Sequence, residues 1–161
     1  MTRTSSALSS LLGADLIKVG LESLDRDEVF EELIDVLART GKITDRTAAL
    51  AAIAEREEQQ STGIGNGVAV PHGKHESVPQ LLCCLGISNE GVDFDAIDDQ
   101  PAHVIFLVLA EVDNPGPHVA LLAGISRLLS RPGFTRRLRE ARSAEEALAA
   151  IRATEEEFDE G

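Results

Sequence analysis

The chain has 161 residues, of which 43% are hydrophobic, and this composition suits one domain with a core of ordinary size. It contains 28 Asp and Glu residues against 15 Lys and Arg residues, so its net charge of −13 argues against nucleic acid or anionic membrane surfaces as partners. No run approaches the roughly 18 apolar residues of a membrane span, and serines interrupt the apolar stretch near the N-terminus, unlike in a secretory signal. We therefore expect a cytoplasmic protein without direct membrane insertion.

The first half of the chain predicts a short strand followed by two helices. Residues 16–19 form a short apolar run that is typical of a strand. From Asp25 onward apolar residues recur at helical spacing, and acidic residues occupy the first turns. A second helix is predicted from a cap at Thr44 or Asp45 to Glu57. Its expected inward positions are Ala48, Ala49, Ala52 and Ile53.

The second half of the chain predicts two buried strands and three helices. Residues 81–87 and 103–109 are short continuous apolar runs, as in strands that are covered on both faces. An acidic, turn-like segment separates them. Helices are predicted over 118–129, 134–142 and 143–151. The expected buried stripe of the first is Val119, Leu122, Ile125 and Leu129.

Helices and buried strands interleave along the chain, which predicts an α/β fold. We expect a single three-layer α/β/α domain over residues 16–152, with a mixed, largely buried sheet and helices on both faces. Residues 1–15 are predicted to be a poorly ordered N-terminus, or a short element with frayed ends, and residues 153–161 a solvated acidic tail.

Two cysteines, Cys83 and Cys84, are adjacent within an apolar run. Neighbouring residues of a strand point to opposite faces of its sheet, so a disulfide between them is not expected. We predict buried, unreactive thiols, with a reactive or metal-binding pair as the alternative.

A glycine-rich stretch over residues 56–75 draws attention to one histidine. Four glycines permit sharp turns and close backbone approach, and Pro71 biases the residue before it towards extended geometry. His72 is therefore expected at the mouth of a strand, where a histidine can act as a nucleophile, a base or a ligand. The alternative is a turn histidine with no chemical role.

Other candidate residues are weaker. His118 follows Pro-Gly-Pro and is expected to open a helix, whose N–H groups and dipole favour an anion and lower the pKa of a histidine. Arg56 ends the second helix, and each of these two residues has an ordinary solvated surface role as its alternative. We expect His103 to be structural, and Lys74 and His75 to lie at a solvated edge.

The sequence predicts no metal site and no nucleotide cofactor. His72 and His75 are three residues apart, but the glycine between them breaks the helix that would aim both at one ion, and no cysteine is spaced to join them. The glycines match neither the phosphate-binding loop that ends in Gly-Lys-Ser/Thr nor a nucleotide-binding βα turn. A metal-dependent hydrolase is accordingly the least favoured reading.

Several segments together resemble the enzyme IIA proteins of the fructose–mannitol class of the bacterial phosphotransferase system, including their nitrogen-regulatory branch. The resemblance covers residues from about 24 to 151. It is carried by Arg56-Glu57-Glu58, by STGIGNGVAVPHG at 61–73, by VDFDAIDDQPAHVIFLVLA at 92–110, and by HVALLA at 118–123 with Leu128-Leu129 behind it.

The resemblance implies a phosphocarrier that needs neither nucleotide nor metal. The histidine after the proline, His72, would accept a phosphoryl group through Nε2 from the carrier protein HPr. His118 would hydrogen-bond the phosphoryl site, and Arg56 would stabilise its charge. The group would then pass to a IIB partner or serve as a regulatory signal.

Two points are left open by the sequence. The run at 93–109 favours the nitrogen-regulatory branch, with a fructose/mannitol-type sugar-uptake component as the alternative. A regulatory binding module of the same fold that transfers nothing onward is a second alternative. The Pro- and Gly-rich loop before His118 and the strongly acidic composition depart from the family pattern.

Overall fold

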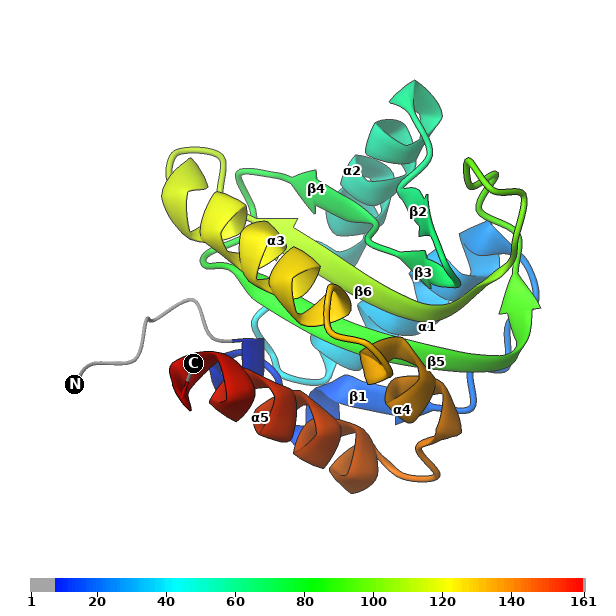
Figure 1. The fold of residues 1–161 in the computed structure, drawn as a ribbon. Coiled ribbons are helices and arrows are strands. Elements are labelled where there is room, and N and C mark those ends of the chain that lie inside the picture. Colours follow the sequence, from blue (N-terminus) through cyan, green and yellow to red (C-terminus); the bar gives the residue numbers. More distant parts are fainter. Residues whose placement is uncertain (1–7, 161) are drawn as a thin grey trace.

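The computed structural model describes residues 8–160 and has three layers, with a sheet between two groups of helices (Figure 1). Helices α1 (Arg26–Ala38) and α2 (Arg46–Gln59) cover one face of the sheet. Helices α3 (Pro115–Leu129), α4 (Phe134–Glu140) and α5 (Ala144–Glu160) cover the other. This arrangement confirms the predicted α/β/α fold with helices on both faces.

The sheet has six strands and is mixed, as predicted. Its central pair is antiparallel and consists of β5 (Leu82–Val92) and β6 (Ala102–Ala110). Strand β1 (Ile17–Val19) runs parallel to β5 at one edge. On the other side β6 is followed by two short parallel stretches of the glycine-rich segment, β3 (Val68–Ala69) and β4 (His72–Lys74), and β2 (Gly63–Gly65) pairs antiparallel with β3.

The sheet divides the core into two apolar clusters, one under each layer of helices. Cys83 belongs to the cluster under α3, α4 and α5, and Cys84 to the cluster under α1 and α2. Both thiols are free and almost completely buried, which confirms the prediction from their strand positions. Burial raises the pKa of Cys83 to about 12 and that of Cys84 well above its usual value, so neither thiol ionises near neutral pH.

Side-chain caps set the predicted starts of three helices. Asp25 accepts a hydrogen bond from the Glu28 N–H at 2.9 Å, and Asp45 accepts one from the Ala48 N–H at 3.0 Å. The Ser143 hydroxyl likewise accepts from the N–H three residues further on, at 3.1 Å. Each cap satisfies a backbone donor that the helix itself leaves free.

For the N-terminal part that the structure describes, the prediction of a poorly ordered segment is wrong, and the alternative of short structured elements agrees with the structure. Residues 8–10 and 14–16 form 3-10 turns, and Leu8 and Leu12 are buried against α5 and the sheet. Residues 8–15 are therefore ordered because their leucines complete the core. Residues 1–7 lie outside the described part of the chain.

The predicted helix end at Ile151 is also wrong, because α5 continues to Glu160 and includes the acidic stretch. Glu156 and Glu157 are exposed, as predicted. Thr154, however, is fully buried and accepts a hydrogen bond from Arg137 at 2.9 Å, and the guanidinium of Arg131 lies 4.4 Å from the ring of Phe158. Contacts with α4 and with the connection between α3 and α4 thus support this end of the helix.

Strand β5 extends five residues beyond its predicted end at Ile87, with a register shift before Val92. None of the helices within residues 8–160 has the length and apolar character that crossing a membrane requires.

Candidate functional site

Strand β4 places His72 at the mouth of a cleft. His72 pairs with Val108 of β6, and the Val108 N–H donates to the Pro71 carbonyl at 3.0 Å. Val70 and Pro71 separate β3 from β4 along the same neighbouring strand. Parallel pairing with β6 therefore fixes the backbone of His72. This agrees with the prediction that Pro71 holds the histidine at the mouth of a strand.

The tautomer of His72 follows from one hydrogen bond. Its Nδ1 lies 2.9 Å from the Val70 carbonyl oxygen. A carbonyl oxygen can only accept, so Nδ1 carries the proton and Nε2 of the neutral ring keeps its lone pair. The ring therefore presents a nucleophilic nitrogen to the cleft.

Gly73 allows α2 to pack directly on β4. A Cβ atom at this position would lie 2.9 Å from the carbonyl carbon and 3.0 Å from the carbonyl oxygen of Ala52. Glycine is needed here for close backbone approach and not for an unusual φ angle. The contact sets the spacing between His72 and the last turn of α2, where Arg56 lies.

His118 is buried in the first turn of α3, and its ring centroid lies 5.4 Å from that of His72. The Nε2 atom of His118 is buried and has no hydrogen-bond partner among the described residues. Burial, with further contributions from charge on His72 and Lys74, lowers the pKa of His118 to about 4. The ring is consequently neutral at pH 7.

The structure changes the predicted position and surroundings of His118. Helix α3 begins at Pro115, so the Pro-Gly-Pro sequence forms its first residues and not the loop before it. Two of its first three residues therefore lack an N–H group, which leaves few backbone donors for an anion. The direction of the pKa shift is as predicted, but burial is its main cause and not the helix dipole.

The buried face of α3 also differs from the predicted one. Val119 is 64% exposed and lies beside the cleft, although it was expected to be buried. The buried positions of the helix are His118, Leu121, Ile125 and Leu128.

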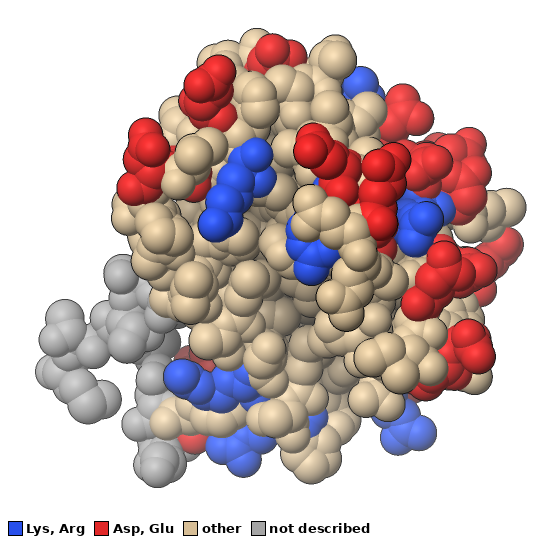
Figure 2. Space-filling view, turned by 90° about the horizontal axis from the view of Figure 1, so that it is seen from above, with Lys and Arg blue, Asp and Glu red and all other residues tan. Residues whose placement is uncertain are grey.

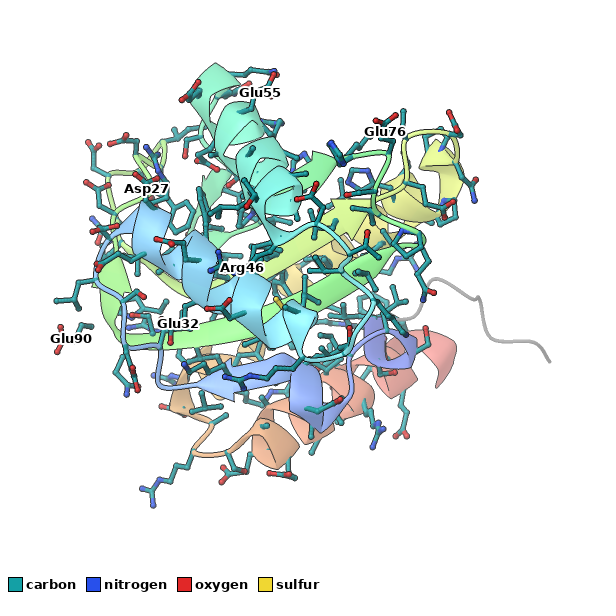
Figure 3. The ribbon with its side chains drawn as sticks, turned by 180° about the vertical axis from the view of Figure 1, so that it is seen from behind. Asp27, Glu32, Arg46, Glu55, Glu76 and Glu90 are labelled. Carbon is teal, nitrogen blue, oxygen red and sulfur yellow. The ribbon has the colours of Figure 1, made fainter. Side chains whose placement is uncertain are left out.

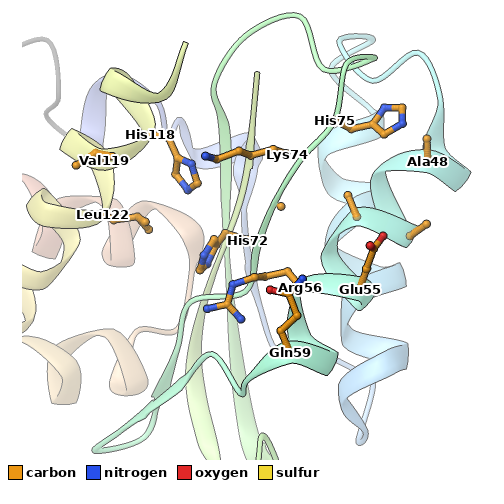
Figure 4. Close-up of a pocket in the computed structure, with 13 residues that line it drawn as sticks. Ala48, Glu55, Arg56, Gln59, His72, Lys74, His75, His118, Val119 and Leu122 are labelled. Carbon is orange, nitrogen blue, oxygen red and sulfur yellow. The ribbon is translucent and has the colours of Figure 1, made fainter. Parts of the chain in front are cut away.

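Arg56 reaches the cleft from the last turn of α2, and Figure 4 shows its guanidinium extended towards His72. One nitrogen, Nη1, donates to the Gln60 carbonyl at 2.8 Å. The remaining guanidinium N–H groups are available to a ligand. Lys74, exposed as predicted, adds a second cation whose side chain extends towards His118 (Figure 4).

These side chains surround a hollow of about 620 Å³. Ala48 and Ala52, which were predicted to face inward, are only half-buried and line this hollow. On the face shown in Figure 2, acidic groups gather towards the right and others lie along the upper left, while separate basic groups interrupt the uncharged surface between them. The cleft therefore combines local positive charge with an acidic protein.

The other two histidines have structural partners. His75 Nδ1 lies 2.8 Å from Ser77 Oγ, and His103 Nδ1 lies 2.9 Å from the Ser88 carbonyl. His103 is thus structural, as expected, whereas His75 borders the cleft without facing His118 closely (Figure 4). Within residues 8–160, no group of three or more His, Cys, Asp or Glu side chains is placed to hold a metal ion.

Sequence reasoning missed Glu57 as a buried carboxylate, which lies next to Arg56 in the chain but faces α1 and not the cleft. It accepts hydrogen bonds from the N–H and the hydroxyl of Thr62, at 2.9 and 2.6 Å. A signal was present, because Glu57 follows Ala49 and Ile53 at intervals of four residues and so shares their inward face.

The fold and cleft define a small α/β domain in which a histidine whose Nδ1 is held by a carbonyl lies beside a second histidine and two cations. A family model described as "Phosphoenolpyruvate-dependent sugar phosphotransferase system, EIIA 2" matches residues 10–154. The chain belongs to this family, which confirms the resemblance seen in its sequence. Members are phosphotransferase components that carry phosphoryl groups on histidine, so the chain is a component of this transferase class.

Relatives from both branches of the family are similar to this chain. The PTS system fructose-specific EIIABC component of Bacillus subtilis is 40% identical over 144 residues, which are 89% of this chain but only 22% of that protein. The nitrogen regulatory protein of Escherichia coli is 32% identical over 155 residues, covering 94% of this chain and 93% of that protein. The chain thus matches a small part of the first protein and nearly all of the second.

Solved structures show the same fold. The nitrogen regulatory protein IIA-Ntr from Neisseria meningitidis superposes with a TM-score of 0.83 at 30% identity, covering 89% of this chain and 98% of that one. The IIA mannitol protein of Escherichia coli, in a complex with phosphorylated IIB, has a TM-score of 0.77 at 22% identity, with coverage of 88% and 97%.

Proposed function

We propose that this chain accepts a phosphoryl group on Nε2 of His72 from an HPr-like phosphocarrier protein and passes it to a IIB-type or regulatory partner. One observation carries the proposal. The bond between His72 Nδ1 and the Val70 carbonyl leaves Nε2 unprotonated, in a cleft that also holds Arg56 and the unpartnered Nε2 of His118. A nucleophile, a fixed cation and a buried hydrogen-bonding group therefore converge.

The reaction is a direct transfer between two histidines. The lone pair on His72 Nε2 forms a new N–P bond while the N–P bond of the donor's phosphohistidine breaks, and the departing electron pair stays on the donor's ring. The transferred group is already activated, so catalysis consists of in-line positioning and stabilisation of charge.

Each neighbouring residue has a defined role in this scheme. The guanidinium of Arg56 offers N–H groups to the phosphoryl oxygens, and Lys74 adds positive potential. His118 is neutral and donates a hydrogen bond from its free Nε2. The Val70 carbonyl stabilises the positive charge that develops on the His72 ring during attack.

The test is incubation with phosphoenolpyruvate, enzyme I and HPr, followed by intact-mass measurement. The protein should gain the mass of one phosphoryl group, stable to base and labile to acid. His72→Ala should abolish the gain, whereas His75→Ala and His103→Ala should preserve it, because both rings are held by structural hydrogen bonds. Equal labelling of His72→Ala would place the acceptor elsewhere.

The output of the phosphorylated protein distinguishes the two branches. The nitrogen-regulatory reading is supported by a structural relative that covers nearly all of both chains, and sugar uptake by the higher identity of the fructose component. Adding a purified IIB domain of the fructose or mannitol type to the phosphorylated chain decides between them. Rapid loss of the label to IIB supports sugar uptake, and retention supports a regulatory role.

A further inference from the structure

A buried carboxylate follows Arg56 along the chain, on the side of α2 that faces α1, and takes no part in the proposed transfer. The side chain of Glu57 is 3% exposed, and it follows Arg56 in the last turn of α2. Burying a carboxylate is costly unless hydrogen bonds and an opposite charge compensate it. Both of its oxygens are bound by Thr62, and Arg26 Nη1 lies 3.6 Å from one of them.

We infer that Glu57 is a positioning residue, which sets both the tautomer of His72 and the placement of Arg56 through Thr62. The Glu57 anchor comprises the carboxylate of Glu57 with the N–H and the hydroxyl of Thr62. The inference rests on the proposed function for its effect on transfer, although its effect on the His72 ring is independent of that function.

The first branch of the anchor leads to His72. The Thr62 carbonyl accepts a hydrogen bond from the Val70 N–H at 3.0 Å. The carbonyl of the same Val70 accepts the His72 Nδ1–H at 2.9 Å. Two consecutive hydrogen bonds therefore connect the anchored Thr62 to the nitrogen that determines the tautomer, and a shift of Thr62 moves the acceptor of that proton.

The second branch leads to Arg56. Its Nη1 is held by the carbonyl of Gln60, which lies beyond the end of α2 and two residues before Thr62. This connection is extended backbone at Gln60 and has no helical hydrogen bonds of its own. The Glu57 anchor thus limits where the Gln60 carbonyl can lie, and with it the direction of the guanidinium.

The segment between α2 and β2 has further contacts, which should limit the displacement caused by removing the Glu57 anchor. Arg26 Nη1 lies 3.7 Å from Asp95 as well as 3.6 Å from Glu57, and Ser61 Oγ donates to the Phe94 carbonyl. The segment before β2 therefore stays attached to the β5–β6 loop when the Glu57 anchor is weakened. Removing the anchor should displace the cleft residues without releasing the whole segment.

A chemically similar anchor exists further along α1, near β1. Glu32 accepts from the Ser23 N–H at 3.0 Å and the Ser23 hydroxyl at 2.6 Å, and Lys18 pairs with it at 2.6 Å. Figure 3 shows Glu32 on α1, on the face away from α3. The Glu32 anchor (Glu32 with Ser23) has the same chemistry but no connection to His72, so it serves as the control.

The experiment compares Glu57→Gln and Thr62→Val with Glu32→Gln and Ser23→Ala. For each variant we measure the melting temperature, the ¹⁵N chemical shifts of the His72 ring without phosphorylation, and kcat and KM for transfer from phospho-HPr. All four variants should lose some stability. Only the Glu57-anchor variants should show an increased share of the Nε2–H tautomer of His72 and a kcat lowered by about tenfold, with KM changed by less than about twofold.

Thr62→Ser supplies the rescue, because it restores the hydroxyl and should return both the spectrum and kcat to wild-type values. The inference is overturned if the His72 spectrum and kcat of Thr62→Val match those of Ser23→Ala at comparable melting temperatures. If wild-type protein accepts no phosphoryl group, the proposed function fails. The ring spectra still test the inference in that case.

Discussion

Phosphorylation of His72 should raise the pKa of His118. In the unphosphorylated protein, burial and nearby positive charge hold that pKa at about 4. The two ring centroids are 5.4 Å apart. At this separation and an effective dielectric constant of about 20, each added negative charge favours the imidazolium of His118 by about 3 kcal/mol, or about two pKa units.

The assay is an NMR titration of the histidine rings before and after phosphorylation. His118 should titrate near pH 4 in the free protein and above pH 6.5 in the phosphorylated form, because about two added charges raise its pKa by about four units. The phosphorylated form is measured above pH 6.5, because phosphohistidine is labile to acid. His103, whose ring is held by the Ser88 carbonyl, is the internal control and should change little.

The same shift has a consequence for stability. The folded protein binds the His118 proton less readily than the unfolded chain, whose pKa is about 6.5, so the free energy of unfolding falls as the pH falls from 6.5 towards 4. Between pH 7.5 and pH 5 the loss amounts to at most about 2 kcal/mol. His118→Gln should remove most of this loss, whereas His75→Gln should not.

An ordinary pKa near 6.5 for His118 in the free protein would refute this reasoning. It would mean that the ring is solvated and that the cleft is wider than the structure shows. A pKa near 4 that does not move on phosphorylation would instead place the phosphoryl group away from this ring, and the role given to His118 would be wrong.

Three further predictions concern the remaining features of the site and the core. Arg56→Ala should lower the rate of transfer from phospho-HPr by about tenfold to a hundredfold, the equivalent of about 1.5–3 kcal/mol, without lowering the melting temperature appreciably, and an unchanged rate would remove Arg56 from the site. Gly73→Ala should destabilise the protein by about 1–3 kcal/mol, measured by urea unfolding, because its methyl group would meet the Ala52 backbone at 2.9 Å. Both cysteines should react with a thiol reagent only as fast as the protein unfolds, and rapid labelling of native Cys83 would contradict its burial.

The layers of this fold were predictable because local patterns and tertiary packing agree. Apolar residues at helical spacing behind Asp25 and Asp45 gave α1 and α2 close to their observed limits. Continuous apolar runs gave β5 and β6 because both strands are covered on both faces. In these segments the positions that packing buries can be recognised from the local pattern of apolar residues.

The errors occur where packing between distant segments decides the structure. The acidic end of the chain has the composition of a solvated tail, but Phe158 contacts Arg131, between α3 and α4, and Thr154 contacts Arg137 of α4. The N-terminal leucines are too few to show a periodic pattern. Their burial is favourable because they cover apolar surface of the sheet and of α5, which the local sequence does not reveal. In α3, packing against the sheet and the neighbouring helices selects a buried face about one position earlier than the predicted stripe, and apolar residues on both faces hide this in the sequence.

The candidate site shows the same division. Pro71 and the glycines made His72 conspicuous, and resemblance to a known family supplied His118 and Arg56 as its partners. Their convergence depends on the contact between Gly73 and α2, which no spacing in the sequence records. Helical spacing could have placed Glu57 on the inward face of α2. It could not have identified the partner, because Thr62 lies beyond the end of the helix, where that spacing no longer applies.

The strongly acidic composition is compatible with an anionic product because charge acts over a limited range. Phosphorylation adds about two negative charges, and at physiological ionic strength exposed charges beyond about 8 Å are largely screened. The groups that matter to the phosphoryl oxygens are therefore those lining the cleft, where Arg56 and Lys74 face a single carboxylate, Glu55. The other nearby carboxylate, Glu57, is turned inward and compensated by Thr62 and Arg26, so its charge supports the backbone of the site without opposing the phosphoryl group directly.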